Sequence, residues 1–342
     1  MSNRIKDLQN ILKLEKLDAV VSTRVLENGF LTGLHLDGYF LLVSTNDVWA
    51  FLPKMLLEHF KSKVNSVHAL SPDNLLDGVI SKMKEKKFKR VGFEPETETY
   101  LRGNFWKKNR LMEKKGLTTK LRMIKKGQEL GTLKKSCCIA ARAFEVIKSR
   151  IKPHRTEISV ARELEDIMQS IGAKGPSFDI IVGSGPNSAL PHHVTSKRQI
   201  KNNEVVLIDF GCVLDFYHSD MTRTIFLGKP NPEYKKVYQI VEQAQEKAIS
   251  KIKDGSKARD IDKTAREHIS DNGYGQYYVH GTGHGIGLEI HEAPTLNTKS
   301  QEVLKQGMTL TVEPGIYLPG KFGVRIEDSV LVTKTGSEIL TK

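Results

Sequence analysis

The sequence has few cysteines and no long apolar run, and each shortage excludes a class of protein. Three cysteines, Cys137, Cys138 and Cys212, are too few for a disulfide framework and suit a reducing compartment, where they act as small buried hydrophobic residues. The apolar runs, such as residues 205–208, are far shorter than the roughly 18 residues that a membrane span needs. The first residues lack the apolar stretch of a secretory signal. We therefore expect a cytoplasmic protein without a membrane segment.

The charge balance is basic, because 53 Lys and Arg against 40 Asp and Glu give a formal net charge of +13. Such an excess would suit a phosphate-rich partner. Here the lysines are spread over residues 82–89, 107–126 and 247–257, without interleaved aromatic residues or a nucleic-acid motif. We expect a solvated surface and no nucleic-acid partner.

The 342 residues are enough for two domains at roughly 100–200 residues each. Residues 1–122 indicate an α/β domain, with Ile5, Leu8 and Leu12 at helical spacing and short strand-like runs at 19–21, 39–43, 48–51 and 91–93. The basic, glycine-containing segment 101–126 indicates a linker. Residues 123–342 form the second domain.

The second domain contains the same order of elements twice. An apolar stripe over residues 130–151 predicts a helix, and a second helix opens at the N-cap Thr156 and ends at Gly172, before strands over 178–227. A stripe over 234–252, a helix capped by Ser256 and ending at Gly273, and strands over 277–340 repeat that order. This pattern predicts an internally duplicated α+β domain whose site draws side chains from both halves.

Two acids in the first half follow apolar strands. Asp209 ends a buried run, and Asp220 comes eleven residues later, with a turn near Leu214 and Asp215 between them. Paired strands would bring the two carboxylates side by side, where they repel each other and lose hydration. A metal ion is the natural compensation.

The second half supplies His284 in a glycine-rich run, Glu313 and Glu327, with His280 and His291 nearby. Taken singly, each is an ordinary turn acid or core histidine. Their occurrence together, in order and in both halves, favours a site with one imidazole and four carboxylates, which match two divalent ions. Such ligands suit Mn²⁺, Fe²⁺, Co²⁺ or Zn²⁺.

These residues resemble the pita-bread metallopeptidases, which include methionine aminopeptidase, aminopeptidase P, prolidase and the non-metal enzyme creatinase. The resemblance covers the whole chain and implies a creatinase-like α/β N-terminal domain followed by a pita-bread catalytic domain with a pseudo-twofold repeat. It implies that Asp220 and Glu327 bridge two ions, that Asp209 holds one, and that His284 and Glu313 hold the other. In this family, residues at the positions of His192, His280 and His291 contact the substrate or the ligands, and His193 stands beside His192 where relatives carry Gly or Tyr.

The resemblance also implies a mechanism. Two ions roughly 3.5–4 Å apart share a water and convert it to a hydroxide that attacks the scissile carbonyl. Glu313 then transfers the proton, while His192 and His291 stabilise the tetrahedral intermediate. The free α-amine of the substrate sits against a metal, which limits cleavage to the first residue.

All five ligands are present, which disfavours creatinase, and Arg325 two positions before Glu327 resembles the prolidase and aminopeptidase P pattern rather than methionine aminopeptidase. We therefore expect cleavage of short peptides with proline at the second position, by an Xaa-Pro aminopeptidase or an Xaa-Pro dipeptidase. Arg325 binds a substrate carboxylate in a fork or orients Asp220 or Glu327.

The alternatives are methionine aminopeptidase and a non-catalytic pita-bread binding module, which would have lost some of its ligands. The resemblance further implies a homodimer and two divalent ions, with Mn²⁺ expected first and Co²⁺, Zn²⁺ or Fe²⁺ as alternatives.

Overall fold

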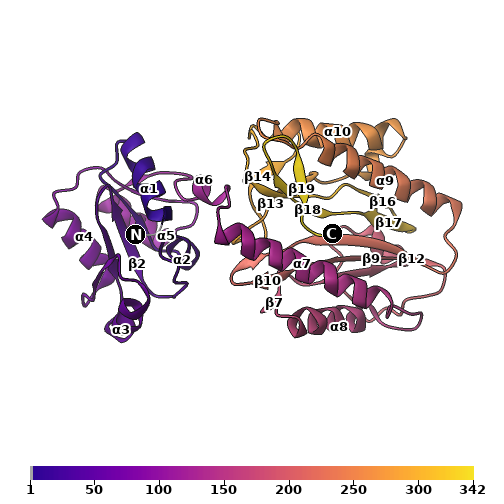
Figure 1. The fold of residues 1–342 in the computed structure, drawn as a ribbon, viewed down its shortest axis with the longest axis horizontal. Helices are drawn as coiled ribbons and strands as arrows, with labels where there is room; N and C mark the ends of the chain where they lie inside the picture. Colours follow the sequence, from indigo (N-terminus) through magenta and orange to yellow (C-terminus); the bar gives the residue numbers. More distant parts are fainter. Residues whose placement is uncertain (1–2) are drawn as a thin grey trace. The chain divides into compact units, whose positions relative to one another are not determined.

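The computed structural model describes residues 3–342, which divide into two compact units at the junction of Leu121 and Arg122. Each unit has its own sheets and its own apolar core (Figure 1). None of the helices within residues 3–342 combines the length and the apolar character that crossing a bilayer requires.

The N-terminal unit is built on one six-stranded sheet in the order β4-β3-β2-β1-β5-β6. Its strands are β1 (Ala19–Ser22), β2 (Phe40–Ser44), β3 (Val48–Phe51), β4 (His68–Leu70), β5 (Val91–Phe93) and β6 (Met112–Glu113). The helices are α1 (Asn3–Leu14), α2 (Val25–Thr32), α3 (Lys54–Lys63), α4 (Leu75–Glu85), α5 (Tyr100–Lys108) and, at the junction, α6 (Thr119–Arg122). The sheet is mixed, because β1–β2–β3 pair antiparallel and β4, β5 and β6 join in parallel.

The predicted helix and strands of this unit are confirmed, since Ile5, Leu8 and Leu12 are fully buried in α1 and the four predicted runs form β1, β2, β3 and β5. The predicted linker over residues 101–126 is wrong. Those residues form α5, β6 and α6, and Trp106 in α5 is fully buried. Most lysines of this segment, such as Lys107 and Lys120, are exposed, whereas Trp106, Leu111 and Leu117 face inward.

The C-terminal unit repeats one order of elements. Its first half consists of α7 (Gln128–Lys148), α8 (Glu157–Ser170), β7 (Gly175–Pro176), β8 (Ile181–Ser184), the 3-10 turn η1 (Gly185–Ala189), β9 (Glu204–Phe210), β10 (Cys212–Leu214), β11 (Tyr217–His218) and β12 (Met221–Leu227). The second half consists of α9 (Pro232–Ser250), α10 (Ala258–Asp271), η2 (Gly275–Tyr277), β13 (Gly283–Gly285), β14 (Glu292–Leu296), β15 (Thr309–Val312), β16 (Gly315–Leu318), β17 (Phe322–Arg325), β18 (Asp328–Val332) and β19 (Ser337–Ile339). The predicted α+β duplication is therefore present.

Helix starts follow the predicted caps in one half and not in the other. Thr156 caps α8, because its side chain accepts a hydrogen bond from the Ser159 N–H. Ser256 does not cap α10, which begins after Lys257. Lys257 is extended and bridges Val303, so the helix starts later and the Ser256 hydroxyl instead donates to the Lys251 carbonyl.

The helices of each half cover one face of that half's strands. Figure 1 shows α7 and α8 along one side of the strands and α9 and α10 along the other. Val206 and Ile208 of β9 are buried in the core shared with α7 and α8. Because side chains alternate along a strand, Asp209 faces away from that core. Val205 on the Asp209 face is buried in the core of the second half, so β9 is packed on both faces and carries Asp209 near its C-terminal end.

The N-terminal core should fail when one leucine is shortened. Leu42 in β2 is fully buried opposite Trp49, and Leu42→Ala leaves a cavity that should lower the free energy of unfolding by about 2–5 kcal/mol. Urea denaturation followed by tryptophan fluorescence measures this, because both tryptophans, Trp49 and Trp106, lie in this unit. Leu14→Ala, at a position 82% exposed, is the matched control and should change little. Equal effects of the two variants would contradict the burial of Leu42.

Candidate active site

Two acids of the first half share one face of the β9–β12 pair. These strands are antiparallel, and Thr222 lies opposite Asp209. Asp220 precedes Thr222 by two residues, so it lies diagonally across from Asp209 on the same face. The register therefore brings together two carboxylates that are eleven residues apart in sequence.

The second half contributes acids from either side of its β15–β18 pair. Val312 at the end of β15 pairs with Asp328 at the start of β18, so Glu313 directly follows one strand and Glu327 directly precedes the other. Glu327 also joins the two halves: its N–H donates to the Thr222 carbonyl at 3.1 Å, and its Oε2 accepts from the Thr222 hydroxyl at 2.7 Å. Acids from both halves thus converge on one point.

His284 lies at the centre of β13, between the two sets of acids. Its Nδ1 is 3.0 Å from the Gly285 carbonyl oxygen, so Nδ1 carries the proton and donates. Nε2 is left facing Asp220 Oδ2 at 3.6 Å and Glu313 Oε1 at 3.5 Å. Ligand atoms of Asp220, His284 and Glu327 all lie within 4.8 Å of one another.

One cavity of about 490 Å³ holds most of the predicted site residues. Eight of them line it: His192, Asp209, Asp220, His280, His284, His291, Glu313 and Arg325. Glu327 is 2% exposed and lies behind this surface, in the group with Asp220 and His284.

Burial favours the neutral forms of Asp220, Glu327, Glu313 and His284. Burial raises the pKa of Asp220, and the charges of Glu327 and Asp209 raise it further. Burial, together with the charge of Glu313, likewise raises the pKa of Glu327, and burial raises that of Glu313. Burial lowers the pKa of His284, so its imidazole is neutral near neutral pH. The site therefore concentrates carboxylates that resist ionising together.

The cluster fits divalent cations. Asp209 Oδ1 and Asp220 Oδ1 are both buried, and neither has a hydrogen-bond partner within residues 3–342. Unpaired buried acceptors are costly, and a cation removes that cost. Carboxylate oxygens with one imidazole nitrogen form a donor set suited to the ions from manganese to zinc.

A chain of hydrogen bonds leads from Asp209 to His280. Arg325 is 3% exposed and donates to Asp209 Oδ2 and, at 2.8 Å, to the Tyr317 hydroxyl. Tyr317 in turn lies 2.8 Å from His280 Nε2, and burial raises its pKa to about 12, so it keeps its proton to donate. Burial opposes the charge on Arg325, but Tyr317 and Asp209 outweigh it and raise the pKa of Arg325. The carboxylate that Arg325 binds is thus Asp209, whereas the sequence suggested Asp220 or Glu327.

The adjacent histidines His192 and His193 face different surroundings. His192 lines the cavity, whereas the His193 side chain is 8% exposed and lies 2.9 Å from Glu157. The two adjacent side chains therefore point to different places, His192 into the cavity and His193 to Glu157.

His291 lies against His284, with ring centroids 4.4 Å apart. Its neighbour Glu292 is held by two buried cations, since Arg122 Nη2 is 2.6 Å and Lys125 Nζ is 2.5 Å from its carboxylate. Arg122 also pairs with Glu289 at 2.6 Å. The segment that begins the C-terminal unit thus fixes the chain on both sides of His291.

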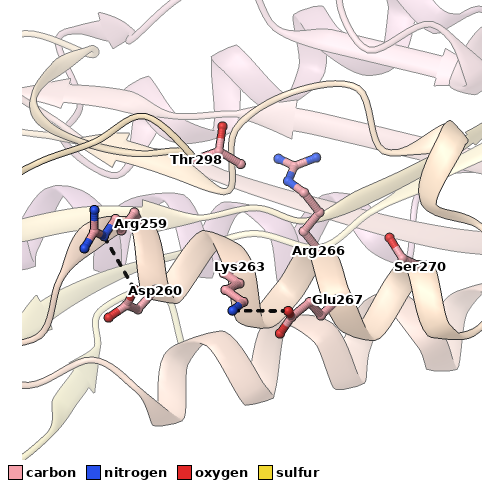
Figure 2. A pocket seen from close by; sticks show the side chains of 7 residues that line it. All are labelled: Arg259, Asp260, Lys263, Arg266, Glu267, Ser270 and Thr298. Atoms are coloured by element: carbon pink, nitrogen blue, oxygen red, sulfur yellow. Dashed lines mark ion pairs between the residues drawn. The ribbon is translucent and has the colours of Figure 1, made fainter.

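A second cavity, of about 600 Å³, lies over α10 and is of a different kind (Figure 2). Four of its charged side chains pair with one another, Arg259 with Asp260 and Lys263 with Glu267, and Arg266 pairs with Asp262. It contains none of the predicted site residues.

Sequence reasoning missed several residues of the site. Tyr317, which connects Arg325 to His280, lies in an ordinary strand pattern and gives no signal. Phe178, Ile181 and Ile290 line the cavity as apolar wall and are indistinguishable in sequence from core residues. Glu157 follows a helix cap and looks like a usual first-turn acid, yet it is fully buried.

Comparison with known proteins places both units in described families. The model of metallopeptidase family M24 matches residues 131–334, and the model of the creatinase/prolidase N-terminal domain matches residues 4–124. An Xaa-Pro dipeptidase of Pyrococcus furiosus is 36% identical over 346 aligned residues, covering 100% of this chain and 98% of the relative.

Two solved structures are similar over nearly the full length. The Xaa-Pro dipeptidase from Bacillus anthracis has a TM-score of 0.96 at 39% identity, covering 99% of this chain and 97% of that one. The X-Pro aminopeptidase from Thermotoga maritima has a TM-score of 0.88 at 32% identity, covering 96% and 97%.

Binding of a divalent ion should release protons near neutral pH. The raised pKa values of Asp220 and Glu327 mean that the metal-free folded protein holds protons that its unfolded chain has lost. Calorimetric titration with Mn²⁺ in buffers of different ionisation enthalpy measures the number of protons released.

For the same reason, the free energy of unfolding of the metal-free protein should fall as pH rises from about 4, the usual carboxyl pKa, through these raised values.

Asp220→Ala should bind the ion more weakly and release fewer protons than the wild type. Asp166→Ala, at an exposed position of α8, is the control and should match the wild type. Binding without proton release would contradict the crowding of the carboxylates.

Proposed function

This chain belongs to metallopeptidase family M24 and is a metal-dependent peptidase; on that premise we propose that it removes the N-terminal residue from short peptides whose second residue is proline. The observation that carries the proposal is the convergence of Asp209, Asp220, His284, Glu313 and Glu327 from both halves of the repeat at one cavity. Two full-length similar proteins, from Pyrococcus furiosus and Bacillus anthracis, are named Xaa-Pro dipeptidases, which favours a dipeptidase. The likeness to the Thermotoga maritima X-Pro aminopeptidase supports the second candidate, an aminopeptidase on longer peptides.

In the proposed site, Asp209 would hold one ion, His284 and Glu313 would hold the other, and Asp220 and Glu327 would serve both. When bound, two such ions supply Lewis acidity that lowers the pKa of water and makes it nucleophilic near neutral pH. Arg325 keeps Asp209 in place and supplies one positive charge to the carboxylate cluster. The two unpaired buried oxygens of Asp209 and Asp220 support these assignments.

Glu313 is the proposed proton carrier. Its carboxylate lines the cavity, with Oε1 3.5 Å from His284 Nε2, so it can reach a water beside the substrate. It accepts the proton of the attacking water and passes it to the leaving nitrogen. The Thr311 hydroxyl, 3.4 Å away, helps to orient the carboxylate.

The three histidines surround the position of the scissile bond. His192 and His291 both reach the cavity, and we assign them to the oxygen that gains charge in the tetrahedral intermediate. Both ring nitrogens of His280 form hydrogen bonds, to the Gly281 carbonyl and to Tyr317. Its ring is therefore held in place, and we assign it a contact with the substrate. Arg325, which also lines the cavity, is the proposed partner of a substrate carboxylate.

The cavity also suits the ring of proline. Phe178, Ile181 and Ile290 give it apolar surface, which binds a ring that lacks an N–H donor. The proline ring would thus lie against the apolar part of the lining, formed by Phe178, Ile181 and Ile290.

Mn²⁺ as the resident ion, a homodimer and a cytoplasmic location complete the proposal. The oxygen-rich donor set supports Mn²⁺. The three cysteines are free, as a reducing compartment requires. Metal analysis of the purified protein and light scattering test the first two points.

One assay separates the candidate activities. With Mn²⁺ bound, the wild type should hydrolyse Ala-Pro. Asp220→Ala should lose at least about 100-fold in kcat/KM, because it removes a carboxylate that would hold both ions. Asp166→Ala, at an exposed position, should retain full activity. Reverse-phase chromatography of the products gives the rates.

The choice of peptide identifies the candidate. Cleavage confined to Ala-Pro indicates the dipeptidase, and cleavage of Ala-Pro-Ala after its first residue indicates the aminopeptidase. Turnover of Met-Ala-Ser alone would replace both with methionine aminopeptidase, and stoichiometric metal binding without any turnover would support a binding module.

A further inference from the structure

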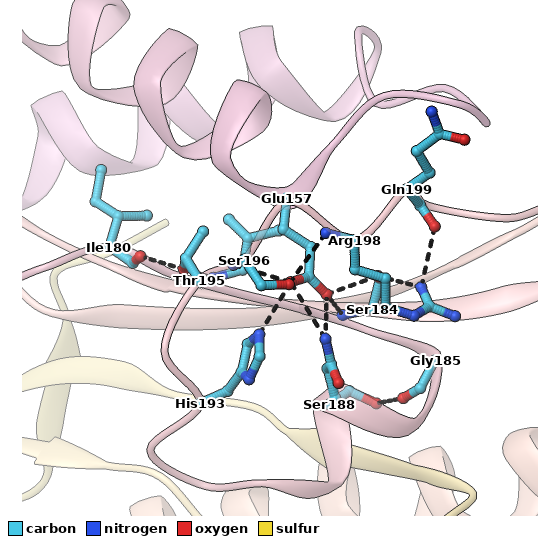
Figure 3. Close-up of polar contacts among 12 residues, drawn as sticks. Glu157, Ile180, Ser184, Gly185, Ser188, His193, Thr195, Ser196, Arg198 and Gln199 are labelled. Atoms are coloured by element: carbon cyan, nitrogen blue, oxygen red, sulfur yellow. Dashed lines mark hydrogen bonds and ion pairs between the residues drawn. The ribbon is translucent and has the colours of Figure 1, made fainter.

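A fully buried glutamate, Glu157, lies at the start of α8 and outside the carboxylate cluster (Figure 3). Its Oε1 accepts from the Ser184 N–H at 2.8 Å, the Ser184 hydroxyl at 2.7 Å and Asn187 Nδ2 at 3.0 Å. Its Oε2 accepts from His193 Nε2 at 2.9 Å and from the Ser196 N–H and hydroxyl at 3.1 and 2.6 Å. Both oxygens are thus saturated by donors from one stretch of chain, residues 184–196.

These hydrogen bonds keep Glu157 ionised. Burial alone would raise its pKa, but the donors from Ser196, His193 and Ser184 outweigh burial and lower it. A carboxylate offers only acceptors, so each contact above is a donor satisfied by Glu157. An amide at this position would turn an N–H toward groups that are themselves donors.

The same stretch carries His192. The His193 N–H donates to the Leu190 carbonyl at 3.1 Å, which closes a turn over residues 190–193. One end of the turn is held where Arg325 donates to the Pro191 carbonyl at 3.2 Å, and the other where His193 meets Glu157. His192 lies between these two anchors.

The direction of the His192 ring depends on the turn that carries it. Within residues 3–342 its ring makes no hydrogen bond, although it lines the cavity near His280 and His291. The position of its ring therefore depends on the backbone of the turn. A shift of about 1 Å in a group that contacts the reacting atoms can cost about 100-fold in rate.

We propose that Glu157 is a positioning residue for catalysis: it fixes the turn at residues 190–193 and thereby aims His192 at the substrate. This inference rests on the proposed function, because it takes His192 to contact the scissile bond. Glu157 itself contacts neither substrate nor ion.

A double-mutant cycle on the Mn²⁺-loaded full chain tests this role, with Ala-Pro as substrate. Glu157→Gln should lower kcat by about 10- to 100-fold, with a smaller change in KM, because the turn loses the acceptor that fits its donors. In the His192→Gln background, the same substitution should cost less than about 3-fold, since the residue through which it acts is gone. Glu165→Gln, whose carboxylate lies at the surface of α8 bonded to Gln169, is the matched control and should match the wild type.

A merely structural role for Glu157 would give a different pattern. Glu157→Gln would then lower kcat by the same factor with and without His192, and that result overturns the proposal. Wild-type kcat in Glu157→Gln also overturns it. Rates are normalised to the folded, metal-loaded fraction, measured by thermal denaturation and metal content, so that partial unfolding is not counted as loss of positioning.

A second readout does not depend on turnover. In Zn²⁺-loaded protein labelled with ¹⁵N-histidine, the ring signals of His192 are those absent from His192→Gln. They should shift in Glu157→Gln and stay unchanged in Glu165→Gln, whereas unchanged signals in both variants contradict the proposal. Failure of the proposed function appears separately, as a wild type that cleaves neither Ala-Pro nor Ala-Pro-Ala; if only the tripeptide is cleaved, it serves as the substrate of the cycle.

Discussion

Mutual repulsion among buried carboxylates is the constraint on which the rest of the C-terminal unit depends. Asp209, Asp220, Glu313 and Glu327 meet in one place, and burial raises the pKa of Asp220, Glu313 and Glu327. Arg325 supplies one compensating positive charge. Bound divalent ions would balance the remaining negative charge of the four carboxylates. The acids lie at or next to the ends of paired strands, and helices pack against these strands.

The duplicated architecture divides the work between its halves. Each half supplies acids from its strands, and each second helix carries a fully buried carboxylate that holds a histidine-bearing segment. In α8 this is Glu157, which holds the turn beside His192. In α10 it is Asp262, which accepts from the Thr282 N–H at 3.1 Å and pairs with Arg266, whose Nη2 donates to the His280 carbonyl at 2.7 Å. The helices therefore support the site from behind as well as covering the core.

Much of this organisation is readable in the sequence, because periodic burial leaves a periodic pattern. The stripes over 130–151 and 234–252 gave α7 and α9, and the alternation around residues 205–210 gave a strand with Asp209 near its end. Composition was less reliable: the lysines of residues 101–126 suggested a linker, although Trp106 anchors that segment in a core. Ser256 failed as a cap because a tertiary pairing, between Lys257 and Val303, sets where α10 begins.

Residues that act through long-range contacts could not be found in this way. Tyr317 joins Arg325 to His280, and Glu157 joins α8 to a segment about 30 residues later, yet neither has a local pattern that differs from that of an ordinary strand tyrosine or first-turn acid. Their roles come from register and helix placement, which a single sequence does not specify.

The ion pairs around Glu292 join stretches of chain that are far apart in sequence. Arg122 and Lys125 hold the carboxylate of Glu292 beside His291, across separations of 170 and 167 residues. Both cations are synthesised long before Glu292. The chain beside His291 can therefore take its final place only after the second half of the repeat has been made.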